Sequence, residues 1–122
     1  MTALWVALAG SAGALARFGL DGAVRHRWPT TFPWATLLVN GTGSLLLGVV
    51  VGLVLFRGEP DALRTVVGTG FCGGYTTFST TSVETVRLLQ AGRRRQAAGN
   101  AVGSLLLTVL AGGAGLALAR LL

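Results

Sequence analysis

Charge is what this sequence has least of. Only 11% of its 122 residues are charged, whereas soluble domains usually carry about 25%. Hydrophobic residues make up 52% of the chain, and the mean hydropathy is +0.67. This balance excludes a soluble globular domain and indicates an integral membrane protein.

Lysine is absent, and all ten basic residues are arginines. They give a formal net charge of +6, but they flank the apolar segments instead of forming one basic face. A nucleic-acid-binding surface is therefore not indicated. Arg25, Arg27 and the run at 93–95 are typical of topology signals beside membrane-spanning segments.

Cysteine and histidine are nearly absent as well. Cys72 is the only cysteine, so the chain cannot form an intrachain disulfide, and a cysteine-based metal cluster is not expected. His26 lies beside two arginines between apolar segments, and no apolar segment pairs a nucleophile with a base. These absences argue against an enzyme.

Four apolar segments are present, at about residues 3–24, 32–56, 62–88 and 97–121. Each has about the 20 residues that a helix needs to cross a bilayer. With their short connections they occupy the whole length, so residues 1–122 are predicted to form a single unit. The expected fold is all-α, with four transmembrane helices.

Polar residues recur at intervals of four within two of these segments, so each set lies on one face of its helix. The second segment carries Thr36, Asn40 and Ser44, and the fourth carries Asn100, Ser104 and Thr108. Such residues often form hydrogen bonds between membrane helices, which is the simpler interpretation for any one of them. Two aligned sets favour a polar pathway. Their side chains are mainly neutral hydrogen-bond donors, which suit an anion better than a cation.

The third segment contains the stretch GFCGGYTTFSTTS (residues 70–82), in which glycines and hydroxyl side chains interrupt an apolar run. Gly73 and Gly74, beside Tyr75 and Thr76, predict a break near the middle of the third helix. A break at membrane depth is tolerated only where the backbone is buried in protein or lines a cavity. Freed carbonyl groups could then hold a cation, as in transporters with discontinuous helices. The alternative is a glycine kink, in which the threonines bond back to the helix.

Three stretches combine these features: GSAGALARF at 10–18, PWATLLVNGTGSLLLG at 33–48 and GFCGGYTTFSTTSVET at 70–85. In order and in pattern they resemble the CrcB/Fluc family of small fluoride channels, over nearly the whole chain. The resemblance implies a channel that passively exports toxic fluoride across the bacterial inner membrane. It also implies a dual-topology dimer, in which two subunits insert antiparallel and form two pores.

The resemblance further implies a structural sodium ion at the dimer centre, held by backbone carbonyl groups of the third-helix break. By position, these carbonyls belong to Gly73 and Thr76. Asn40 matches the pore asparagine, Arg17 an arginine of the pore vestibule, and Phe78 the first of two pore phenylalanines. The residues expected along the fluoride pathway are Thr36, Asn40, Phe78, Ser79, Thr81, Asn100, Ser104 and Thr108.

One position departs from the family pattern. Members usually carry a second phenylalanine three residues after the first, and Thr81 stands there in this sequence. An aromatic ring presents a positive edge to an anion. We expect the Thr81 hydroxyl to replace that contact by a hydrogen bond to fluoride. The alternative is that Thr81 lines a pore that this subunit does not use, because a different partner supplies the active one.

The arginines are also unevenly placed along the predicted spans. Three lie toward one side, at 57, 64 and 120, and the other seven lie toward the opposite side. This bias argues against insertion in both orientations, and some family members are similar in forming heterodimers of oppositely oriented subunits. A homodimer is expected, and a heterodimer stays open.

A small multidrug-type proton antiporter is the rival transporter, since it too is a four-helix dimer. It needs an ionisable carboxylate inside its first helix, but the first segment has no acid before Asp21, near its end. A non-transporting scaffold would explain the small residues but not the aligned donors. The fluoride channel is the preferred interpretation.

Overall fold

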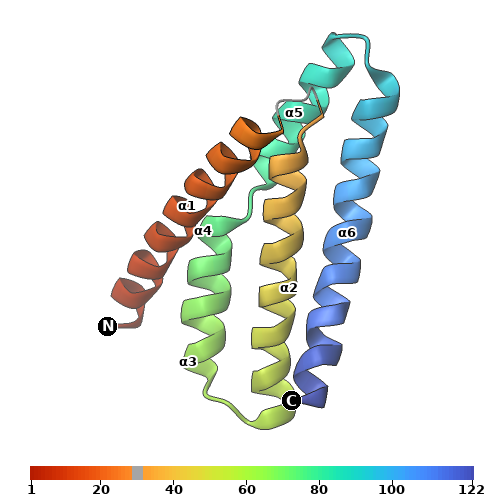
Figure 1. The fold of residues 1–122 in the computed structure, drawn as a ribbon. Helices are drawn as coiled ribbons and strands as arrows, with labels where there is room; N and C mark the ends of the chain where they lie inside the picture. Colours follow the sequence, from red (N-terminus) through yellow and green to blue (C-terminus); the bar gives the residue numbers. More distant parts are fainter. Residues whose placement is uncertain (29–31) are drawn as a thin grey trace.

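The computed structural model describes residues 1–28 and 32–122, which are helical except for short connections. The long helices are α1 (Thr2–Arg27), α2 (Trp34–Arg57) and α6 (Arg94–Leu121). Between α2 and α6 the chain forms α3 (Asp61–Leu63), a π-helical stretch η1 (Arg64–Cys72), α4 (Gly73–Tyr75) and α5 (Phe78–Gln90). The first three of these pieces run on into one another as a single rod, and α5 continues beyond a short extended link (Figure 1).

Among the described residues, three helices are long and apolar enough to cross a membrane: α1, α2 and α6. Within the chain, only 6% of the α1 span and 11% of the α6 span are buried. Large apolar side chains such as Phe18 and Leu110 are 80% and 70% exposed. These outer faces suit lipid, so the prediction of a multi-pass, all-α membrane protein is confirmed. The third segment is divided among shorter pieces.

The third segment is interrupted near its middle, as the sequence predicts, but not at the glycines. Gly73 has helical dihedral angles (φ −62°, ψ −40°), and α4 continues to Tyr75. The backbone becomes extended at Thr76 (φ −82°, ψ 158°) and Thr77 (φ −148°, ψ 113°). The break therefore consists of Thr76, which the predicted stretch includes, and Thr77, whereas the two glycines and Tyr75 are still helical.

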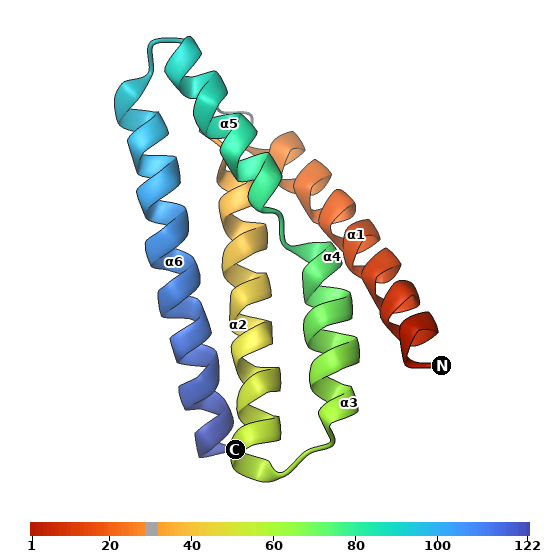
Figure 2. The same cartoon turned by 180° about the vertical axis from the view of Figure 1, so that it is seen from behind.

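The glycines serve close packing instead. A Cβ atom on Gly74 would overlap the backbone carbonyl of Gly10 in α1, and one on Gly13 would overlap the carbonyl of Phe71 in η1. Small residues let membrane helices approach to backbone contact. α1 therefore lies directly against the first half of the third segment, which both views show (Figures 1 and 2).

α2 and α6 form the most extensive helix pair and lie side by side in both views (Figures 1 and 2). A Cβ atom on Gly48 would overlap the Gly112 carbonyl, and one on Gly115 would overlap the Leu45 carbonyl. This pairing holds the two polar faces predicted from the sequence on neighbouring helices.

Replacing Gly13 by alanine should destabilise the fold by about 1–3 kcal/mol. The new methyl group would meet backbone atoms of Phe71 and Tyr75, which cannot move aside as a side chain could. Gly19→Ala is the matched control on the same helix, because a Cβ there meets nothing within 4 Å. Alanine is the better helix former, so this control should be neutral or stabilising. Thermal unfolding in detergent measures both variants, and equal unfolding temperatures would contradict the close crossing.

Candidate functional site

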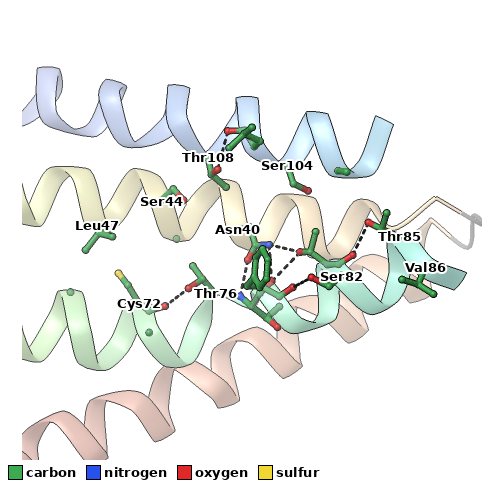
Figure 3. Close-up of a pocket in the computed structure, with 18 residues that line it drawn as sticks. Asn40, Ser44, Leu47, Cys72, Thr76, Ser82, Thr85, Val86, Ser104 and Thr108 are labelled. Carbon is green, nitrogen blue, oxygen red and sulfur yellow. Dashed lines mark hydrogen bonds between the residues drawn. The ribbon is translucent and has the colours of Figure 1, made fainter. Parts of the chain in front are cut away.

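A groove of about 680 Å³ lies between α2, α6 and the two halves of the third segment (Figure 3). Every residue that lines it is uncharged. Figure 3 shows Asn40 reaching from α2 toward the break, with Ser104 and Thr108 on α6. Of the residues expected from the sequence, those that border this groove are Asn40, Gly73, Thr76, Phe78, Thr81, Ser104 and Thr108.

A smaller cavity of about 190 Å³, here called the Arg17 cavity, lies beside the groove. Its lining includes Arg17, Thr36 and Thr77. Thr77 also lines the groove, so this residue stands at the boundary between the two spaces. The structure thus brings the predicted vestibule arginine within one residue of the groove. Ser79 instead borders a third cavity, which is lined by charged side chains as well.

Asn40 forms hydrogen bonds with the backbone of the break. Its Oδ1 accepts the Thr77 N–H at 2.8 Å, and its Nδ2 donates to the Thr77 carbonyl at 3.0 Å and to Thr81 Oγ1 at 2.9 Å. The Thr81 hydroxyl donates to the same Thr77 carbonyl at 3.0 Å. Both amide hydrogens of Asn40 and the hydroxyl hydrogen of Thr81 are thus used within the protein. Donation from either residue to an anion stays a prediction, and it requires one of these bonds to open.

The same contacts release two carbonyl groups of the third segment. In a continuous α-helix the Thr77 N–H would bond to the Gly73 carbonyl, and the Thr80 N–H to the Thr76 carbonyl. Here the Thr77 N–H donates to Asn40, and the Thr80 N–H donates to the Thr77 hydroxyl. Hard cations bind oxygen ligands of this kind. The carbonyl groups of Gly73 and Thr76, which the family resemblance implies as sodium ligands, therefore lack their α-helical donors and are oxygen ligands of the kind that sodium binds.

The hydroxyl groups of the groove differ in whether their hydrogen is free. Thr76 donates to the Cys72 carbonyl, and Thr108 to the Leu105 carbonyl, so each bonds back to its own helix. Ser104 is different: its Oγ is buried and has no hydrogen-bond partner among the residues that the structure describes. Ser104 also lines the groove, but its Oγ is not itself exposed there, so the hydroxyl would have to rotate to meet an ion in the groove.

Thr36 bonds to a carboxylate. Its hydroxyl donates to Glu84 of α5, which is 48 residues away in the sequence. Arg25 contacts the same carboxylate at 3.1 Å and Asp21 at 2.9 Å. Helical spacing predicts Thr36 on the face of Asn40, but it gives no sign of this charged partner. Arg25 therefore pairs with two carboxylates, of which Asp21 lines the Arg17 cavity and Glu84 lines the third cavity.

Asn100 lies outside the groove. Its side chain is fully buried, and its Nδ2 donates to Thr85 Oγ1 at 2.9 Å, which joins α6 to α5. Its Oδ1 has no hydrogen-bond partner within residues 1–28 and 32–122. The structure therefore places this residue between two helices, one turn before Ser104, and not on the groove wall.

Thr77 belongs to this site, although it is not among the site residues expected from the sequence. A hydroxyl residue directly before a helix, which accepts an N–H of the first turn, is the ordinary N-cap pattern. Thr77 accepts the Thr80 N–H in this way at 3.1 Å. The N-cap pattern could indicate Thr77 from the sequence alone. The capping residue is hard to identify, however, because several neighbouring residues also carry hydroxyl groups.

Comparison with known proteins agrees with this architecture. The family model described as CrcB-like protein, Camphor Resistance (CrcB), matches residues 4–116. A protein of Leifsonia xyli named fluoride-specific ion channel FluC 1 is 49% identical over 95% of this chain and 85% of its own length. A Cutibacterium acnes protein named fluoride-specific ion channel FluC 2 is 48% identical over 97% of both chains. A Magnetococcus marinus protein of the same kind, FluC, is 44% identical over the full length of both. The chain belongs to the CrcB family.

Proposed function

We propose that this chain is the subunit of a fluoride-specific ion channel that passively exports fluoride, and that it is not an enzyme. The observation that carries the proposal is the groove, whose lining is uncharged and bears hydroxyl and amide groups. Neutral donors can replace the hydration of a small anion without binding a cation. The names of the three relatives, all fluoride-specific ion channels, support the choice of fluoride.

The proposed pathway begins at Arg17, whose positive charge would attract anions into the smaller cavity. Asp21 lines the same cavity, but its carboxylate is paired with Arg25. The pathway passes Thr77 and continues along the groove, where the buried Ser104 hydroxyl, which has no partner among the described residues, would supply a donor after rotating toward the ion. Phe78 borders the same groove and can offer its positive ring edge. Several weak sites in succession suit a channel, because an ion must leave as readily as it enters.

The proposed working unit is an antiparallel dimer in which each subunit crosses the membrane four times, the third segment spanning as two half-helices. Phe78 supports a partner at the groove, because this large ring is 86% exposed beside buried polar groups. Two identical subunits are the simplest arrangement. A heterodimer remains the alternative, since the arginines are unevenly distributed between the two ends of the helices.

A sodium ion at the centre of the dimer is the proposed structural cofactor. The carbonyl groups of Gly73 and Thr76 would hold it, two from each subunit, because their helical donors are diverted to Asn40 and Thr77. When bound, the ion supplies positive potential that favours an anion nearby. An experimental structure of the dimer in sodium with an empty break would overturn this site.

Arg25→Gln should lower fluoride flux about 1.5- to 5-fold at low ionic strength, as expected for a partly exposed ion pair. The change leaves Glu84 and Asp21 without their shared cation beside the Arg17 cavity. The effect should shrink as salt is added. Arg27→Gln is the matched control, since Arg27 stacks on Trp28 at 5.8 Å instead of bridging these carboxylates. Equal flux in the two variants would contradict the role of Arg25.

Growth of fluoride-sensitive bacteria tests the function in cells. A strain that lacks its own fluoride exporter should regain growth in fluoride medium when it expresses this chain at the inner membrane. The comparison strain expresses the Asn40→Asp variant at the same level. Growth that is no better with the native chain than with an empty vector would oppose the proposal for a homodimer.

A further inference from the structure

We propose that Thr81 is a positioning residue that acts through Asn40, holding Thr77 at the boundary between the Arg17 cavity and the groove. The three residues Asn40, Thr77 and Thr81 are called the clamp below. They are 7%, 8% and 8% exposed, so water cannot readily replace their mutual bonds. The inference rests on the proposed function, because it assigns a role within the fluoride pathway.

The chemistry of the clamp permits only one assignment of donors and acceptors. The Thr77 N–H can only donate, so the Asn40 atom 2.8 Å from it must be the amide oxygen. The Asn40 nitrogen can only donate, so Thr81 Oγ1 must accept from it at 2.9 Å. The Thr81 hydrogen is then left for the Thr77 carbonyl at 3.0 Å. Every polar group of the set is satisfied in this arrangement.

Thr77 needs such a partner because its backbone has left the helix. Its extended conformation removes its N–H from the α-helical ladder, whereas its carbonyl, as that of the N-cap residue, still begins the ladder of α5. The Asn40 carboxamide bonds to both groups, as a neighbouring peptide would. Thr81 fixes the orientation of that carboxamide by binding its second hydrogen. Without the Thr81 hydroxyl, one buried N–H of Asn40 would lack a hydrogen-bond partner, and the bonds between Asn40 and Thr77 would weaken.

The hydroxyl of Thr81 is therefore the group that matters, not the size of its side chain. A phenylalanine at this position, which the family pattern usually has, could not accept the Asn40 hydrogen. Valine has nearly the shape of threonine but lacks the hydroxyl, whereas serine retains it. These two substitutions separate the hydrogen bond from the packing.

Fluoride efflux from liposomes gives the first test. Thr81→Val should reduce flux about tenfold, the usual order of effect for a buried donor left unpaired. Thr81→Ser should stay near the native rate. Thr69→Val, on the exposed side of η1 and away from both cavities, is the control for the same substitution. Native flux in Thr81→Val, or equal loss in Thr81→Ser and Thr81→Val, would overturn the proposal.

Hydrogen exchange at the Thr77 amide, measured without fluoride, gives the second test. A positioning role predicts about tenfold faster exchange in Thr81→Val, because local opening becomes easier. Thr81→Ser and Thr69→Val should exchange as the native protein does. If Thr81→Val lost flux with unchanged exchange, Thr81 would act on the ion directly and the clamp would be refuted. If the native chain did not conduct, the proposed function would fail, while the exchange rates would still decide on the clamp.

Discussion

Asn40→Asp should reduce fluoride flux by about a hundredfold or more, the scale expected for an uncompensated charge in a buried site. Aspartate has the shape of asparagine but offers no N–H. Its second oxygen would face the Thr77 carbonyl and Thr81 Oγ1, which now accept hydrogen bonds at 3.0 and 2.9 Å. The substitution therefore opens the break and places negative charge beside the path of an anion.

The measurement is fluoride efflux from liposomes that contain equal amounts of native and variant protein. Size-exclusion chromatography should show the same assembly for both, because the contact surfaces of the helices are unchanged. Asn40→Leu removes the donors without adding charge, so it should retain more flux than Asn40→Asp. Efflux near the native rate in Asn40→Asp would remove Asn40 from the pathway.

Ser104→Ala should lower fluoride flux about tenfold or more without loss of stability. A hydrogen bond to a charged group contributes about 1.5–3 kcal/mol. The Ser104 hydroxyl has no partner among the described residues, and because Ser104 lines the groove, a rotation of its buried side chain would offer this donor to fluoride. For the same reason, removal of its hydroxyl breaks no bond within the protein. A change in function with an unchanged unfolding temperature is the signature of a group that serves the ion.

Ser11→Ala is the matched control for Ser104. The Ser11 hydroxyl donates to the Ala7 carbonyl at 2.9 Å on the exposed side of α1, outside the groove. Its loss should leave the flux at the native rate. If both variants conducted equally, or if Ser104→Ala unfolded at a lower temperature, Ser104 would be a structural residue.

Much of the fold could be predicted from the sequence because membrane spans depend on length and polarity alone. The segments expected at 3–24, 32–56 and 97–121 correspond to α1, α2 and α6 within a few residues. The break was expected at the glycines, yet Gly73 and Gly74 are helical. A glycine can serve flexibility or close approach, and only the position of α1 shows which one applies.

For the candidate site, the sequence predicts the helix face on which a residue lies, but not the residues to which it forms hydrogen bonds. Spacing by four correctly placed Asn40 on a polar face of α2, and Ser104 on the neighbouring face of α6. The bonds of Asn40 join residues 37 and 41 positions apart, and no local pattern reveals them. The sequence also does not reveal which hydroxyl groups lack a hydrogen-bond partner, because this depends on the rotamer of each side chain and on its nearest carbonyl group.

Fluoride release by the purified chain alone is the most direct test of the central claim, that this chain forms its own fluoride pathway. Liposomes loaded with fluoride and chloride would receive only this protein, and ion-selective electrodes would follow both anions in the outer solution. We expect rapid fluoride release, and chloride release no faster than from protein-free liposomes. Liposomes that retain their fluoride, or that release both anions at the same rate, would contradict the claim.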